Sequence, residues 1–192
     1  MNFYMALGNS LYVAWLIFFA YWLVASFHVN RMERRDSPGQ RLGRIFLALV
    51  AIYLLNSTDP RLGVLNEEFV RWRPWVLESA VALTWAGLAV AIWARYHIGR
   101  YWSAAVALRE EHKLIRSGPY ARIRHPIYTG ILMMMAGTAL AIGRYSALLA
   151  FAITLAGIVW KARREEALLA SQFGEAFEEH RRHTGFFLPR LS

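Results

Sequence analysis

The chain has 192 residues, 57% of them hydrophobic and 18% charged, and its apolar residues gather in runs that a single soluble domain would interrupt every few positions. It contains no cysteine, which excludes disulfides, thiolate metal ligands and a cysteine nucleophile. Its net charge of +9 comes from basic residues that lie between the apolar runs and form no separate basic arm, so a nucleic-acid partner is not expected.

Apolar runs along the chain predict five transmembrane helices. They cover residues 7–27, 42–56, 75–98, 126–142 and 145–160. The second, fourth and fifth are short for a span, so we expect these helices to be tilted or to have ends shielded by protein. The first run begins in MNFYMALGNS, which has no Lys or Arg, and basic residues follow the run. This charge order indicates a retained helix rather than a signal peptide.

The charges between the runs predict the orientation of these helices. The first loop, the third connection and the tail carry 17 of the 22 Lys and Arg residues, whereas the opposite loops carry four and Arg44 lies inside the second run. This difference predicts a protein of the inner or plasma membrane with its N-terminus outside and its C-terminus in the cytoplasm. Residues 142–146 have room only for a tight turn, so the fourth and fifth helices should be antiparallel neighbours.

The hydrophobic pattern changes after residue 160. Leu168, Leu169, Phe173 and Phe177 recur at helical spacing among charged residues, which predicts an amphipathic helix on the membrane surface or under the bundle. The expected fold is therefore an all-α integral membrane bundle of five transmembrane helices with a C-terminal amphipathic helix. We expect residues 1–192 to form a single domain.

Polar residues gather where the basic third connection meets the fourth predicted helix. SGPY predicts a turn at Gly118 and Pro119, and RHPIYTG follows it. Pro126 suits a helix start, where the first backbone amides point outward to an anion or a polar ligand. Tyr128 and Gly130 place an aromatic ring beside a possible close backbone approach.

A second charged group lies at the end of the fifth run. The predicted hairpin brings it alongside the start of the fourth helix, and its members are Arg163, Arg164, Glu165 and Glu166. Arginines beside membrane helices usually mark topology and contact lipid phosphates. Two acids together with several bases at one membrane mouth would also suit a zwitterionic ligand.

Two segments together, IGRYWSAAVALREEHKLIRSGPYARIRHPIYTG and RREEALLASQFGEAFEEHRRHTGFFLP, resemble the isoprenylcysteine carboxyl methyltransferase family, which is similar to phospholipid N-methyltransferases. The specific elements are GPY, RHPxYxG and EE in this order around a helical hairpin. The resemblance implies an integral membrane methyltransferase that uses S-adenosylmethionine. It assigns residues 94–189 to the cofactor-binding catalytic part.

The resemblance also implies a cofactor pocket between the cytoplasmic ends of the last helices, closed by the C-terminal segment. Carried over by position, its residues are His112, Leu114, Gly118, Tyr120, His125, Pro126, Tyr128, Gly130, Glu165 and Glu166. No metal ligand is implied. Phe177 and His180 stand where the family often has the tyrosines of FGxxYxxY, so neither position offers that hydroxyl.

The chemistry of this cofactor agrees with the assignment. Glu165 or Glu166 would bind its ammonium or ribose hydroxyls, and tyrosine faces would attract its sulfonium by about 0.5–2 kcal/mol. An acceptor carboxylate is already ionised near pH 7 and needs no base. Arg163 and Arg164 are the candidates for holding that anion, and Glu166 is a further candidate catalytic residue. The expected partners are membrane lipids and a lipophilic or lipidated acceptor that arrives from the bilayer.

Three alternatives remain open. A phospholipid amine N-methyltransferase would share the cofactor site but would need a base such as His125 or Glu166. A membrane sterol-type reductase using NADPH would carry NPNYxGE-like text, whereas Ile127 and Ile131 occupy the polar positions here. A non-enzymatic protein that binds anionic lipids would account for the arginines but not for the paired acids. The sequence leaves the acceptor, the choice of O- or N-methylation and the oligomeric state undetermined.

Overall fold

The computed structural model of the protein describes residues 2–26, 38–99 and 114–190. Its elements are α1 (Asn2–Ser26), α2 (Pro38–Asn56), η1 (Pro60–Asn66), α3 (Pro74–Ile98), η3 (Gly118–Ala121), α4 (Pro126–Ile142), α5 (Tyr145–Phe173) and α6 (Glu175–His183). Within these ranges the only β-type pairing consists of two isolated bridges. The predicted all-α fold is confirmed.

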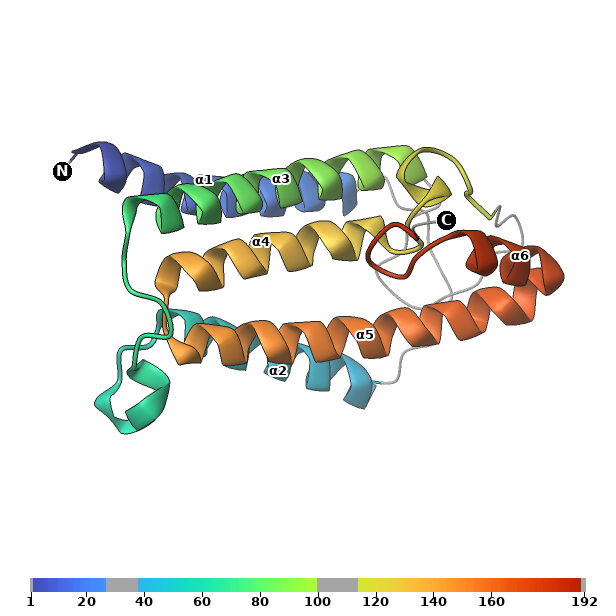
Figure 1. The fold of residues 1–192 in the computed structure, drawn as a ribbon. Coiled ribbons are helices and arrows are strands. Elements are labelled where there is room, and N and C mark those ends of the chain that lie inside the picture. Colours follow the sequence, from blue (N-terminus) through green and yellow to red (C-terminus); the bar gives the residue numbers. More distant parts are fainter. Residues whose placement is uncertain (1, 27–37, 100–113, 191–192) are drawn as a thin grey trace.

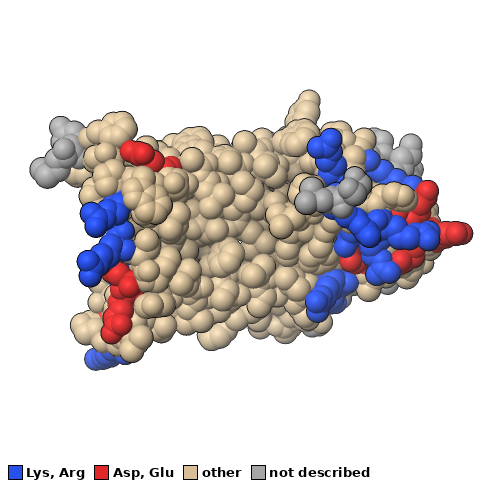
Figure 2. All heavy atoms as spheres, viewed as in Figure 1, with Lys and Arg blue, Asp and Glu red and all other residues tan. Residues whose placement is uncertain are grey.

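The long helices form one elongated bundle and alternate in direction (Figure 1). α1 lies along α3, α2 lies along α5, and α4 lies between α3 and α5. The N-terminus and the α4–α5 turn are at one end, which we call the turn end. The start of α4, the end of α5, α6 and the C-terminus are at the other, which we call the site end. On the face drawn in Figure 2, charged residues lie at the two ends and an uncharged band separates them, as a bilayer requires.

Three helices are long and apolar enough to cross a membrane by themselves, namely α1, α3 and α5. α2 reaches this length only together with η1, across a bend of 83°, and α4 is an apolar helix of 17 residues. Both are among the three short runs for which the sequence predicted tilted or shielded helices, and the third, α5, is long enough to span by itself. The membrane bundle is confirmed, and helices in the five predicted places are compatible with five crossings.

Small residues allow α3 and α4 to pack closely. A Cβ added at Gly87 would lie 2.8 Å from the backbone nitrogen of Met134. A Cβ added at Gly130 would lie 2.6 Å from the backbone nitrogen of Ala91. Such residues let helix backbones approach in a membrane, where van der Waals packing takes the place of the hydrophobic effect. This packing fixes the start of α4 at the site end.

α5 is longer than the predicted run of residues 145–160. It continues past residue 160 as one helix to Phe173. Residues 161–173 contain no Gly or Pro and are rich in Ala, Leu, Glu and Arg, so no signal in this segment ends the helix. The break comes at Gly174, whose φ of 51° favours glycine, and the shorter α6 follows. Glu165 and Glu166 therefore lie on the same continuous helix as the fifth span.

Candidate functional site

The C-terminal segment lies against the start of α4. The backbone N–H of Arg124 donates to the carbonyl of Gly185 at 2.9 Å, and that of His125 donates to Phe186 at 3.3 Å. In return the N–H of Gly185 donates to the carbonyl of Arg122 at 3.0 Å. We call residues 184–187 the strap, because these bonds tie this segment to the residues just before α4. We call the region where the start of α4 meets α5 at the site end the mouth.

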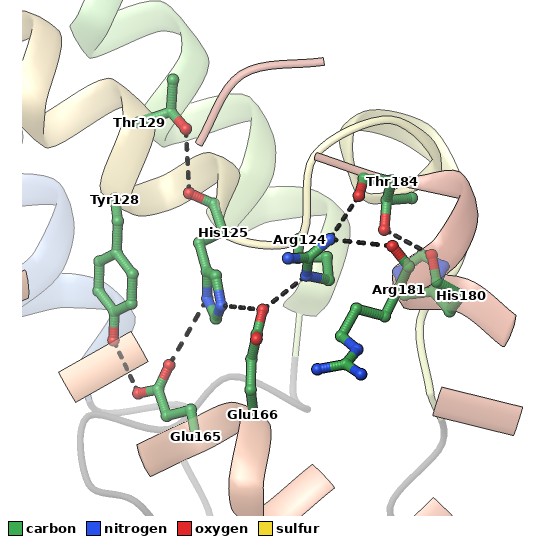
Figure 3. A network of polar contacts seen from close by, with 9 residues as sticks. All are labelled: Arg124, His125, Tyr128, Thr129, Glu165, Glu166, His180, Arg181 and Thr184. Atoms are coloured by element: carbon green, nitrogen blue, oxygen red, sulfur yellow. Dashed lines mark hydrogen bonds and ion pairs between the residues drawn. The ribbon is translucent and has the colours of Figure 1, made fainter. Parts of the chain in front are cut away.

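Glu166 of α5 accepts two contacts from the residues just before α4 (Figure 3). Its Oε1 lies 3.1 Å from His125 Nε2 and accepts a hydrogen bond of 2.5 Å from Arg124 Nε. The side chains of Arg124 and Glu166 are only 12% and 15% exposed. Arg124 also donates to the carbonyls of Thr184 and Arg181. Arg124 thus joins the acid of α5 to the strap and to α6.

Glu165 lies on the other side of the His125 ring. It accepts a hydrogen bond of 2.7 Å from the Tyr128 hydroxyl, and its second oxygen lies 3.9 Å from His125 Nδ1. The His125 and Tyr128 rings stack with centroids 5.6 Å apart and an angle of 21° between their planes. Lys161, one turn earlier on α5, places its Nζ 3.8 Å from Glu165 Oε1. His125 therefore lies between two carboxylates.

Aromatic side chains surround this cluster. Phe186 of the strap meets the His125 ring edge to face at 4.9 Å. Tyr120 is buried beside Ile127 and Tyr128. Burial raises the pKa of the Tyr120 hydroxyl, and the Glu165 carboxylate raises it further, so this hydroxyl is neutral at physiological pH. The mouth combines apolar walls with few, paired charges.

The structure brings five of the predicted residues together, and they are His125, Pro126, Tyr128, Glu165 and Glu166. Gly118 and Tyr120 form η3 nearby. Gly118 has φ 58°, and an added Cβ would lie 2.6 Å from the His97 ring, so both its conformation and its close approach require glycine. Leu114 is half-buried in the loop before η3. His112 falls outside the described residues.

Three predicted residues do not join the cluster. Gly130 faces α3, so it serves the close packing of two helices and gives no approach to a ligand among the acids. Arg163 is exposed, and Arg164 donates to Gln40 of α2 at 3.1 Å and covers the Trp160 ring. Successive residues on a helix point about 100° apart. When Glu165 and Glu166 face α4, the two preceding arginines are therefore turned away from it.

The sequence interpretation missed Arg124, Lys161 and the individual residues of the strap. Arg124 stands directly before His125 and was counted with the topology arginines. Its spacing could not separate it from Arg122, because its partners, Glu166 and Thr184, come from distant parts of the chain. The resemblance implied closure by the C-terminal segment but named no residue of GFFLP, to which Phe186 and Phe187 belong. Over the ranges that the structure describes, no group of three or more His, Cys, Asp or Glu side chains is arranged to hold a metal ion.

Comparisons with known proteins place this geometry in context. The model of the isoprenylcysteine carboxyl methyltransferase family matches residues 80–171. The chain is 38% identical over 129 residues to the cobalt-zinc-cadmium resistance protein CzcN of Cupriavidus metallidurans, covering 64% of this chain and 55% of that protein. It is 30% identical over 120 residues to the protein-S-isoprenylcysteine O-methyltransferase of Schizosaccharomyces pombe, covering 59% and 49%.

A third relative is the nickel-cobalt-cadmium resistance protein NccN of Alcaligenes xylosoxydans xylosoxydans. It is 31% identical over 123 residues, which cover 62% of this chain and 54% of that protein. The chain spans about half the length of the curated relatives it matches.

Proposed function

We propose that the chain belongs to the isoprenylcysteine carboxyl methyltransferase family and that it transfers a methyl group from S-adenosylmethionine to the carboxylate of a prenylcysteine or a similar lipophilic acceptor. The observation that carries the proposal is the half-buried cluster at the site end. There, Glu165 and Glu166 contact the stacked side chains of His125 and Tyr128. Ionisable groups that are partly withdrawn from water at a membrane surface are candidates for a functional site. Their burial costs stability, and a function can explain why that cost is tolerated.

The donor set fits the proposed cofactor, which supplies an activated methyl group on a sulfonium cation. Glu165 or Glu166 would hold the ammonium or the ribose hydroxyls, and the stacked faces of Tyr128 and His125 would adjoin the adenine or the cation. Each acid already accepts a contact from a neighbouring side chain. These contacts would hold both carboxylates in place before a ligand binds.

The proposed reaction requires no general acid or base from the protein. A carboxylate oxygen of the acceptor forms the new bond to the methyl carbon while the carbon–sulfur bond breaks and its electron pair stays on sulfur. The products are a methyl ester and a neutral thioether, and no proton moves. The chain therefore aligns the two substrates and excludes water, for which Phe186 and Phe187 of the strap cover the side of His125.

The fold suggests separate routes for the two substrates. The site end carries the predicted cytoplasmic charges, so the polar cofactor would enter there from the cytoplasm. The apolar acceptor would enter sideways from the bilayer. Two relatives are named for resistance to cobalt, nickel, zinc or cadmium. We assign methyl transfer and not metal binding to this cluster, because its acids pair with Arg124, His125, Tyr128 and Lys161.

The test is methyl transfer by purified protein given methyl-labelled cofactor and a panel of prenylcysteine, fatty-acid and phospholipid-amine acceptors. We expect base-labile label on the prenylcysteine or on another lipophilic carboxylate. Label on phospholipid amines alone would instead support the N-methyltransferase. Thermal stabilisation by NADPH, with none from S-adenosylmethionine or its demethylated product, would support the reductase.

A further inference from the structure

Lys161 lies on the membrane side of the cluster. α5 runs from the turn end toward the site end, so Lys161 is reached one turn, or about 6 Å, before Glu165 (Figure 1). Its side chain is 19% exposed, and its Nζ lies 5.3 Å from the centre of the Tyr128 ring. On this path along α5 it is the cation that meets the mouth from the side of the bilayer.

Two of the arginines at the site end, Arg124 and Arg164, are held differently. Arg124 donates to Glu166 and to two backbone carbonyls on the strap side, and Arg164 faces α2. Lys161 makes a looser contact, because 3.8 Å to Glu165 is an ion pair and exceeds hydrogen-bond length. The same Glu165 oxygen already accepts the Tyr128 hydroxyl at 2.7 Å. An ammonium has three donors, so Lys161 can turn toward another anion without breaking a hydrogen bond to Glu165.

We propose that Lys161 binds the carboxylate of the acceptor and selects anionic acceptors over cationic ones. This inference rests on the proposed function. An acceptor whose lipid tail lies in the bilayer would place its charged head group at the first polar side chains that it meets on the way to the site end. These side chains are Lys161 and Tyr128. The four-carbon stem can lie along apolar surface while the ammonium stays at that level. A carboxylate leaving water needs such a partner, whereas an ammonium head would be repelled.

The test uses the full-length protein with Lys161→Met and Lys161→Arg. Arg71→Gln is the control, since it removes one exposed positive charge at the opposite end of the bundle. Initial rates are measured against the concentration of the carboxylate acceptor, and the affinity for the demethylated cofactor is measured separately. We expect Lys161→Met to raise the acceptor KM by about tenfold to a hundredfold, as expected for the loss of a hydrogen bond to a charged group, with cofactor affinity unchanged. Lys161→Arg should recover most of the loss.

Several results would overturn the inference. An unchanged acceptor KM in Lys161→Met would show that this cation does not bind the acceptor. A parallel loss of cofactor affinity, or an equal effect in Arg71→Gln, would assign the change to a general disturbance. Failure of the proposed function would look different, because the wild-type protein itself would then methylate no carboxylate acceptor. That result would overturn both the proposed function and the role of Lys161.

Discussion

The two ends of α4 are held by similar backbone hydrogen bonds, yet they differ in how far nearby carboxylates are buried. At the turn end, the N–H of Phe69 donates to Gly143 at 2.9 Å, and Arg144 donates to the carbonyl of Ser57. At the site end, the strap makes the same kind of backbone bonds. Glu67 and Glu68, beside the backbone bonds of the turn end, are exposed, whereas Glu165 and Glu166 of the site end are half-buried.

Fastening a loop therefore does not require the buried charges. Backbone bonds and one arginine suffice beside Glu67 and Glu68 at the turn end, where these two carboxylates stay in water. Removing paired charges from water costs free energy that hydrophobic packing would not. The difference supports the proposal that the cluster at the site end binds a ligand, and the following predictions test that proposal.

The largest expected effect concerns which sides of the membrane the two ends face. Reporter fusions after Ile142, at the turn end, and after Leu191, at the C-terminus, should report opposite sides, with the C-terminal fusion in the cytoplasm. The measurement is reporter activity in intact cells. Two fusions on the same side would contradict the five crossings.

The next largest effect comes from comparing Arg124 at the site end with Arg144 at the turn end. Arg124→Met should lower the free energy of unfolding by about 3 kcal/mol and abolish most activity, because Glu166 is left half-buried without its strongest partner. Arg144→Met at the turn end is the matched control and should cost about 1 kcal/mol, the value of a typical hydrogen bond. Denaturation of both variants in the same detergent compares them. Equal losses would mean that the site end is built only for stability.

Gly130 separates packing from ligand binding. Gly130→Ala should destabilise the protein by about 1–3 kcal/mol, because the new methyl group would press on the backbone of α3. Protein that remains folded should bind the cofactor normally. Gly157→Ala is the control, because no other atom lies within 4 Å of a Cβ added there, and it should be neutral or slightly stabilising. If Gly130→Ala had normal stability but lost its affinity for the cofactor, Gly130 would instead belong to the cofactor site.

Tyr128 tests the cluster with a smaller change. Tyr128→Phe removes the hydrogen bond to Glu165 and should weaken cofactor binding by about fivefold, corresponding to about 1 kcal/mol. Tyr128→Ala should weaken it further, because the ring also stacks on His125. Titration with the demethylated cofactor measures both. Equal effects of the two variants would mean that the ring itself contributes nothing.

The smallest expected effect is a pH dependence at the site end. Burial lowers the pKa of His180 below its usual 6.5, and the nearby Arg116 and Arg124 guanidinium groups lower it further. The unfolded chain then binds more protons than the folded one, so stability is full above about pH 6.5 and falls as pH drops through the lowered pKa. The thermal midpoint should fall between about pH 7 and pH 5 in wild type. It should fall less in His180→Gln, and an unchanged slope would exclude His180 as the cause.

The positions of the helices were largely predictable from the sequence alone. The apolar runs, the tight turn near Gly143 and the helix start at Pro126 all depend on local properties, namely hydropathy, glycine conformation and the fixed φ of proline. The close spacing of His125, Tyr128 and the paired acids was predictable for the same reason, since a short turn forces α4 and α5 to lie side by side.

Only the tertiary structure decided which arginine meets the acids and which face Gly130 presents. Arg124, Arg163 and Arg164 are alike in type and in closeness to a predicted helix end, so no local pattern distinguishes them. Their separation depends on the rotation of α5 about its axis and on the return of the strap to the start of α4. Both come from contacts between distant segments, whose energies depend on packing in three dimensions and leave no signal in the local sequence.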